Sequence, residues 1–210
     1  MKIIGITGPT GAGKTTALHA LADLGAAVID CDAVYHDLTA NSAPMLDELR
    51  QRFGDGIFGP DGALARKALG AIVFGDEGAL RDLNAITHRY VNDEVDRRLD
   101  QARSEGRPAA AVDAIALLDS DLKDKCHCTV AVTAPDEVRV RRIMARDGIG
   151  EEYARLRLAA QKPVVFFEQN SDYTLENGGE DPEEFYRRAR ALFEPLIFQS
   201  VEKGEAFSDG

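Results

Sequence analysis

The chain has 210 residues, of which 44% are hydrophobic and 29% charged, which is typical of a folded soluble protein. Its formal net charge of −11 argues against an extended nucleic-acid-binding face, because such a face would be basic. Three cysteines, Cys31, Cys126 and Cys128, are too few for a disulfide framework and indicate a reducing compartment.

The apolar residues at the start of the chain leave no room for a signal peptide before the first expected strand. No apolar run approaches the length needed to span a membrane. We therefore expect a cytoplasmic protein that binds neither nucleic acid nor membranes. The segment Cys126-His127-Cys128 lacks zinc-site spacing and a second ligand pair, so it is interpreted as the entrance to a strand.

A short apolar run, residues 3–6, predicts a buried strand near the start of the chain. The next residues, Gly8 to Thr15, match the phosphate-binding pattern G-x-x-x-x-G-K-[ST], and a helix is expected over 16–24. A glycine-rich turn that matches by chance is the alternative, but it would not explain the strand before and the helix after. The segment predicts that the chain binds a nucleoside triphosphate.

The roles of the loop residues follow from the motif. Glycines let the backbone turn tightly and aim its N–H groups inward, where the positive end of the helix also attracts phosphate. Lys14 would reach the β- and γ-phosphates, and the Thr15 hydroxyl would ligate the Mg²⁺ that accompanies ATP. The residues expected to bind ATP here are Gly8, Gly11, Ala12, Gly13, Lys14, Thr15 and Thr16.

The second expected strand, 26–29, is followed by two carboxylates, Asp30 and Asp32. Ligands of an open parallel sheet bind outside the carboxyl ends of its strands, so both carboxylates are well placed. One could take a proton from an attacking hydroxyl group, and either could hold a Mg²⁺-bound water. The alternative is that Asp30 or Asp32 only caps the next helix.

Residues 33 to about 107 are mostly helical in pattern, and this stretch is long for a simple crossover between strands. We expect a helical lobe that covers the acceptor substrate. Within it, Arg66 and Lys67 follow a turn, and His88 and Arg89 are expected near the start of another helix. Singly, each of these residues is more often a surface charge than a ligand.

Three further strands are expected, over 108–113, over 128–133 and within 171–179. Asp113 follows the first of these strands and would be available to the outer shell of the metal. A final amphipathic helix is expected over 181–196.

A helix over 136–147 carries a basic cluster. Arg142 and Arg146 are four residues apart and so share a face, and stabilisation of a triphosphate would explain them. For Arg139 and Arg141 we favour salt-bridged surface positions. The segment 148–150 is a hinge-like break before a second helix over 151–162, and the two helices resemble a mobile lid.

Taken together, these residues resemble the bacterial dephospho-coenzyme A kinase family, which phosphorylates the ribose 3′-hydroxyl of dephospho-CoA in the last step of CoA synthesis. The resemblance covers most of residues 1–180, and an ordered set of segments is more specific than a phosphate loop alone. The matching segments are 6–16, 24–25, 28–32, 53–54, 61–69, 72–74, 83–88, 142–148, 160–161, 172–173 and 177–179.

The resemblance implies an α/β P-loop kinase fold of the nucleoside-monophosphate-kinase type. It would have a five-stranded parallel sheet flanked by helices, a helical substrate-binding lobe and a lid. The expected boundaries are 1–33, 108–135 and 168–200 for the P-loop core, 34–107 for the CoA-binding lobe, and 136–167 for the lid. The polar tail, 201–210, is expected to be frayed.

The resemblance also implies roles for single residues. Asp32 would be the general base, Lys14 and Thr15 would handle phosphates and Mg²⁺, and Arg142 would neutralise charge from the lid, with Arg146 beside it. The acceptor side would comprise Asp32, His36, Arg66 and His88. From their positions after the strands, rather than from the resemblance, Asp30 or Asp113 is expected to contact the metal through water.

Three departures from the family lie near the expected acceptor site. The family usually has Arg where this chain has His36, Pro where it has Arg89, and a Pro-Leu-Leu segment where it reads Ala116-Leu117-Leu118. His36 offers one hydrogen bond where Arg offers a fork of two, so weaker or pH-dependent acceptor binding is expected.

Two alternatives stay open. One is a P-loop kinase for another small acceptor such as a nucleotide, and the other is a non-catalytic ATP-binding regulatory protein. The sequence does not define the oligomeric state, and a monomer is compatible with it.

Overall fold

The computed structural model describes residues 1–179 and 181–199, so the tail expected at 201–210 lies outside the described residues. The chain divides into two compact units. One is built from the residues up to Val28 and those from Ala102 onward, and the other from Ile29–Gln101. The second unit consists mostly of helices.

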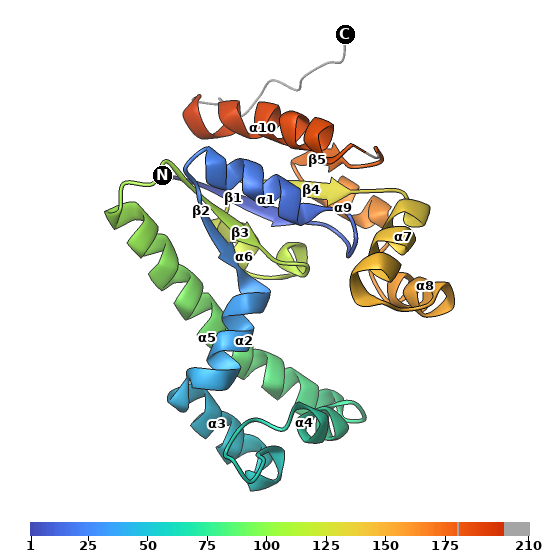
Figure 1. Ribbon diagram of the computed structural model, residues 1–210. Helices are drawn as coiled ribbons and strands as arrows, with labels where there is room; N and C mark the ends of the chain where they lie inside the picture. Colours follow the sequence, from blue (N-terminus) through green and yellow to red (C-terminus); the bar gives the residue numbers. More distant parts are fainter. Residues whose placement is uncertain (180, 200–210) are drawn as a thin grey trace. The chain divides into compact units, whose positions relative to one another are not determined.

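The first unit is organised around a parallel sheet. β1 pairs in parallel with β3 and with β4, and β4 pairs in parallel with β5 (Figure 1). The strand order is β2-β3-β1-β4-β5, so β1 is central. The predicted five-stranded parallel sheet is confirmed. Its strands are β1 (Lys2–Thr7), β2 (Ala27–Asp30), β3 (Ala109–Asp113), β4 (Cys128–Thr133) and β5 (Tyr173–Glu176).

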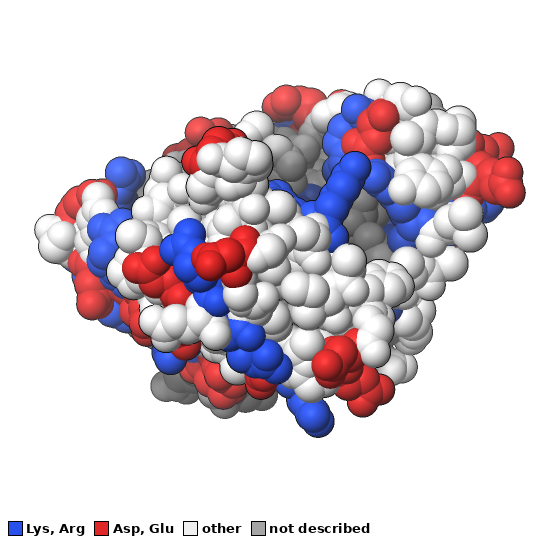
Figure 2. Space-filling view, turned by 90° about the horizontal axis from the view of Figure 1, so that it is seen from below, with Lys and Arg blue, Asp and Glu red and all other residues white. Residues whose placement is uncertain are grey.

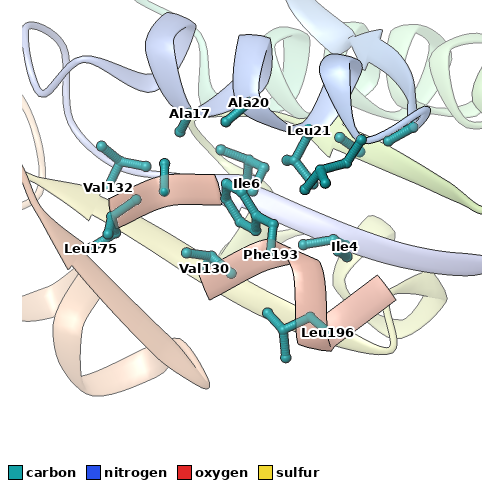
Figure 3. Close-up of a cluster of buried hydrophobic side chains, with 14 of the residues drawn as sticks. Ile4, Ile6, Ala17, Ala20, Leu21, Val130, Val132, Leu175, Phe193 and Leu196 are labelled. Atoms are coloured by element: carbon teal, nitrogen blue, oxygen red, sulfur yellow. The ribbon is translucent and has the colours of Figure 1, made fainter. Parts of the chain in front are cut away.

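Two helices, α1 (Lys14–Asp23) and α10 (Pro182–Phe198), lie side by side along one face of this sheet (Figure 1). Their apolar side chains meet those of β1, β4 and β5 in the main core, where Ile6 and Phe193 are fully buried (Figure 3). The central strands are apolar along their length because both faces of the sheet are covered. On the other side lie short elements, η2 (Leu117–Asp119), α6 (Leu122–Lys125) and α9 (Val164–Asn170).

The helix pair expected as a lid consists of α7 (Asp136–Asp147) and α8 (Glu151–Ala159). The two pack together through Val140, Ile143 and Ala154. Gly148 ends α7 with a φ of 65°. The second helix ends at Ala159, before its expected end at Lys162. Lys162 itself is excluded from a regular helix because Pro163 disfavours a helical conformation at the residue before it. The helix that then begins at Val164, α9, was not predicted.

The helical unit contains α2 (Cys31–Asn41), α3 (Ala43–Phe53), η1 (Asp55–Ile57), α4 (Arg66–Val73) and most of α5 (Glu77–Ser104). It has a small core of its own. None of the helices in the described part of the chain has both the length and the hydropathy to cross a bilayer. The core residues of this unit are Met45, Leu49, Ile57, Leu69 and Ile86.

The expectation that His88 and Arg89 lie near the start of a helix was wrong. Both lie in the middle of α5, a single helix of 28 residues. The helix is continuous because no Gly or Pro occurs between residues 79 and 105. The Arg89 guanidinium pairs with the Glu48 carboxylate of α3, which also accepts a hydrogen bond from the Tyr90 hydroxyl at 3.1 Å.

Candidate active site

The loop between β1 and α1 requires glycine at particular positions. Gly8 and Gly13 have φ values of 134° and 100°, which L side chains rarely adopt. A Cβ at Gly8 would lie 2.0 Å from the Val132 carbonyl oxygen, and one at Gly13 would lie 2.1 Å from Asn177 Nδ2. Glycine therefore provides both the backbone conformation and the space that this loop needs.

Side chains from distant segments hold two of the loop's carbonyl groups. Arg142 Nη1 donates to Gly11 O and to Ala12 O, both at 3.3 Å, and Asn177 Nδ2 donates to Ala12 O at 2.9 Å. In a trans peptide group the C=O and N–H bonds point in opposite directions. Holding the Ala12 carbonyl toward Arg142 and Asn177 therefore turns the Gly13 N–H away from them, toward the open side of the loop.

The first turn of α1 adds positive potential beside this loop. The earliest N–H groups of a helix have no helical partner and attract anions, and the first turn of α1 contains no acidic residue. Lys14 begins the helix, and its Nζ donates to Gly8 O at 3.2 Å. Thr15 follows and is exposed. The arrangement can hold an anion of the size and charge of a phosphate group.

Arg142 is bound on several sides. Its Nη2 donates to Asn177 Oδ1 at 3.1 Å and to Gly179 O at 3.4 Å, in addition to its bonds with the loop. Burial, and secondarily Arg141, lowers the pKa of the Arg142 guanidinium, which still keeps its charge at neutral pH. Asn177 was given no role in the sequence analysis, although it lies in one of the segments that resemble the family.

Arg146 is placed differently from Arg142. Its side chain is 60% exposed and pairs with the Asp147 carboxylate at 2.7 Å. No hydrogen bond between Arg146 and the phosphate loop occurs in the described residues. Sharing a helix face with Arg142 does not bring Arg146 to the loop, because it lies one turn farther along α7.

Arg139 was predicted at a salt-bridged surface position; it does pair with Asp136, but the surface position was wrong. Its side chain is only 3% exposed, and its Nε donates to Thr10 O at 3.0 Å. The helix begins directly after β4, which pairs with β1, so its first turns lie against the loop that follows β1. Charge periodicity alone could not show which face of α7 packs there. Arg141 is exposed, as expected.

The two carboxylates after β2 have different surroundings. Asp30 is the N-cap of α2, where its Oδ1 accepts a hydrogen bond from the Ala33 N–H at 2.9 Å. Asp30 therefore has the helix-capping role that was the alternative to a role in proton transfer or metal binding. Asp32 lies in the first turn of α2, is exposed, and forms no hydrogen bond with the described residues. Its carboxylate is available to a ligand.

The other expected acceptor residues all belong to the helical unit. His36 is exposed on α2 and His88 is exposed on α5. Arg66 is exposed at the first position of α4, with its Nη2 donating to Thr39 Oγ1 at 3.3 Å. Each of the three can therefore meet a ligand without unfolding the unit.

The described residues contain no group of three or more His, Cys, Asp or Glu that could hold a metal ion. Mg²⁺ bound to a nucleotide keeps several waters and takes most other ligands from phosphate. The exposed Thr15 hydroxyl fits the one direct protein ligand that the motif assigns. Asp113, expected to act through water, ends β3, where it is in register with Ile6 of β1.

The segment from Cys126 to Cys128 leads into β4, which begins at Cys128, as the sequence predicted. Cys126 Sγ donates to Leu122 O at 3.3 Å, and His127 Nδ1 accepts from the Ile3 N–H at 3.0 Å. Burial raises the pKa of the Cys126 thiol to about 12 and that of Cys128 to about 11. Both side chains are therefore protonated thiols at neutral pH.

Cations gather locally although the chain is acidic overall. On the face shown in Figure 2, Lys and Arg side chains and Asp and Glu side chains are both present. At the phosphate loop, Lys14, Arg139 and Arg142 all donate hydrogen bonds to loop carbonyl groups. An acidic protein can bind a phosphorylated small molecule when a few cations converge in this way.

Comparison with known proteins gives consistent results. A family model described as dephospho-CoA kinase matches residues 2–183. A dephospho-CoA kinase of Geobacter sulfurreducens is 38% identical over 193 residues, which is 92% of this chain and 98% of the relative. One of Symbiobacterium thermophilum is 39% identical over 179 residues, 85% of this chain and 75% of the relative.

Solved structures show the same fold. A protein of Thermus thermophilus superposes with a TM-score of 0.77 and 32% identity, covering 95% of this chain and 98% of the other. A dephospho-CoA kinase of Campylobacter jejuni superposes with a TM-score of 0.66 at 21% identity, covering 94% and 98%. The predicted P-loop kinase fold is confirmed.

Proposed function

The chain belongs to the dephospho-CoA kinase family, and from this we propose how its residues carry out the family's reaction. The protein uses ATP to phosphorylate the ribose 3′-hydroxyl of dephospho-CoA, which gives CoA. The observation that carries this conclusion is the loop from Gly8 to Thr15, held by Arg142 and Asn177 in a chain that matches the family over residues 2–183.

On the phosphate side, we assign ATP to the loop and to the start of α1. The N–H groups of Gly13 and of the first turn of α1 would bind phosphate oxygens, and Lys14 would exchange Gly8 O for the β- and γ-phosphates. Phosphoryl transfer spreads negative charge over the transferred group, so fixed cations and N–H groups lower its barrier. Arg142 would add one cation, and Arg146 a second if α7 and α8 rearrange.

Mg²⁺ would be held by the Thr15 hydroxyl and by the phosphates, with Asp30 or Asp113 contacting it through water. When bound, the ion neutralises phosphate charge. Thr15 is free to take this role because it is exposed and lies directly after Lys14.

On the acceptor side, Asp32 would orient the 3′-hydroxyl and take its proton. Support comes from its position after the carboxyl end of β2 and from its exposed carboxylate without a hydrogen-bond partner in the described chain. His36, Arg66 and His88 would bind the rest of dephospho-CoA, with the helical unit as the CoA-binding lobe. The helices α7 and α8 would serve as a lid that excludes water.

We place the reaction in the cytoplasm, because Cys31, Cys126 and Cys128 are reduced cysteines.

The test is an assay of ADP release with ATP·Mg²⁺ and dephospho-CoA, beside a control without acceptor. We expect release that depends on dephospho-CoA, with the product identified as CoA by mass. If ADP release depended on a nucleotide instead of dephospho-CoA, that nucleotide would be the acceptor of the phosphoryl group. ATP binding without acceptor-dependent release would contradict the proposed function and favour a regulatory nucleotide-binding protein.

Replacing Arg142 by Met is expected to raise the KM for ATP and to lower kcat by about 10²-fold, because one cation near the phosphates is lost. The KM for dephospho-CoA should change less than threefold. Steady-state kinetics with each substrate varied in turn will measure this. Arg141→Met is the matched control, since Arg141 is exposed on the same helix. Equal effects of both substitutions would contradict a specific role for Arg142.

Replacing His36 by Arg is expected to lower the KM for dephospho-CoA and to flatten its pH dependence. Arg offers two parallel hydrogen bonds and stays charged, whereas histidine changes its charge between about pH 5 and 8. The KM of both forms should be measured from about pH 5.5 to 8. If the KM for dephospho-CoA of the wild type varied as little with pH as that of the variant, this result would contradict a role of His36 in acceptor binding.

A further inference from the structure

The side chain of Gln161 holds Thr10 in the middle of the phosphate loop. Its Oε1 accepts a hydrogen bond from the Thr10 N–H at 3.0 Å, and its Nε2 donates to Thr10 Oγ1 at 2.7 Å. The two residues are 151 positions apart in the sequence. Gln161 lies just after α8, so this pair of bonds connects the end of the expected lid to the loop.

Arg139 completes the contacts of Thr10. Its Nε donates to Thr10 O at 3.0 Å, and its Nη2 donates to Gln161 Oε1 at 3.2 Å. The N–H, the carbonyl and the hydroxyl of Thr10 are thus all bound by two side chains. The buried guanidinium is paired with Asp136, whose Oδ1 lies 2.8 Å from Nη1. The positive charge of Arg139 is therefore balanced by the Asp136 carboxylate.

These contacts fix the orientation of one peptide group. The Thr10 carbonyl points toward Arg139, so the N–H of the same peptide group, on Gly11, points the other way. Arg142 and Asn177 hold the next two carbonyls, those of Gly11 and Ala12. Three successive carbonyls of the loop are therefore held by side chains from other segments.

We propose that Gln161 and Arg139 are positioning residues that brace Thr10, and that this brace sets the affinity of the loop for the nucleotide phosphates. The inference rests on the proposed function only in taking the loop as the ATP site. A preorganised loop binds more tightly because less conformational freedom is lost on binding. Neither side chain needs to touch the nucleotide.

The residues around Gln161 and Arg139 indicate that the protein can fold without the hydrogen bonds from Gln161 to Thr10. Arg139 and Gln161 both line a cavity of about 760 Å³ that also borders the ends of β4 and β5 and the helices α8 and α9. Charged side chains such as Asp136 and Arg155 also line this cavity, so water can enter it and satisfy Thr10 when Gln161 is removed. Loss of Gln161 should therefore loosen the loop without unfolding the protein.

The experiment measures the dissociation constant of ADP by calorimetry, and the KM of both substrates, for Gln161→Leu and Gln161→Glu. The Leu variant removes three hydrogen bonds, so we expect the ADP dissociation constant and the KM for ATP to rise about tenfold. The KM for dephospho-CoA should stay within twofold of the wild type. The Glu variant keeps an acceptor for Thr10 and Arg139 and should stay within about threefold in ADP affinity.

Two further variants serve as controls. Thr10→Val removes only the hydroxyl, so a rise of about threefold in the ADP dissociation constant is expected even if Gln161→Leu fails to fold. Gln169→Leu makes the same change as Gln161→Leu at an exposed position of α9 and should leave ADP binding unchanged. The melting temperature of each variant reports on folding.

Unchanged ADP affinity in Gln161→Leu or in Thr10→Val would overturn the proposal. So would equal rises in the KM of both substrates, which would indicate general damage. Calorimetry with ADP does not depend on the acceptor. A wild type without acceptor-dependent turnover would therefore contradict the proposed function, while the ADP measurements would still decide the role of Gln161.

Discussion

Replacement of Asp32 by Asn is expected to lower kcat by about 10²–10⁴-fold, because the amide cannot accept the proton of the ribose hydroxyl. The substitution preserves the size of the side chain, so the fold and the affinity for ATP should stay close to the wild type. Steady-state kinetics with dephospho-CoA, together with calorimetry of ADP binding, will measure both effects.

A matched control for Asp32 is Asp37→Asn. Asp37 is an exposed carboxylate on the same helix, α2, where it accepts a hydrogen bond from Asn41 at 2.7 Å. This control should keep the wild-type kcat. A kcat of Asp32→Asn equal to that of the wild type would show that another group, or solvent, takes the proton. Asp30 would then be tested with Ser, which still caps the helix but cannot act as the base.

Replacement of Lys14 by Met is expected to lower kcat by about 10²–10³-fold and to raise the KM for ATP. The variant loses the positive charge beside the transferred phosphate but keeps most of the aliphatic side chain. Among the described residues, Lys14 donates to Gly8 O, a neutral acceptor in a loop that other side chains also hold. The melting temperature should therefore change little.

The control for Lys14 is Lys123→Met on α6, whose ammonium group donates to Asn170 O at 3.5 Å. This variant should show wild-type kinetics. If Lys14→Met kept its kcat and lost only affinity for ATP, Lys14 would bind the ground state and transition state equally. That result would contradict its role in stabilising the transition state.

The sequence by itself determined the features that depend on neighbouring residues. The strands β1 to β4 were predicted because each contains a short apolar run bounded by turn residues, and the phosphate loop because its glycines and Lys14 stand at fixed spacing. The capping alternative for Asp30 was also available from its position directly before a helix. Gln161 and Asn177 were given no role from the sequence, although both lie in segments that resemble the family.

The tertiary structure decided which distant side chains reach the loop. Arg139, Arg142 and Arg146 have similar spacing and chemistry, yet two hold loop carbonyls and the third pairs with its neighbour Asp147. The sequence could not separate them, because burial depends on how α7 leaves β4 and packs beside β1. Helix periodicity shows which residues share a face, whereas only the packing of other segments shows what that face contacts.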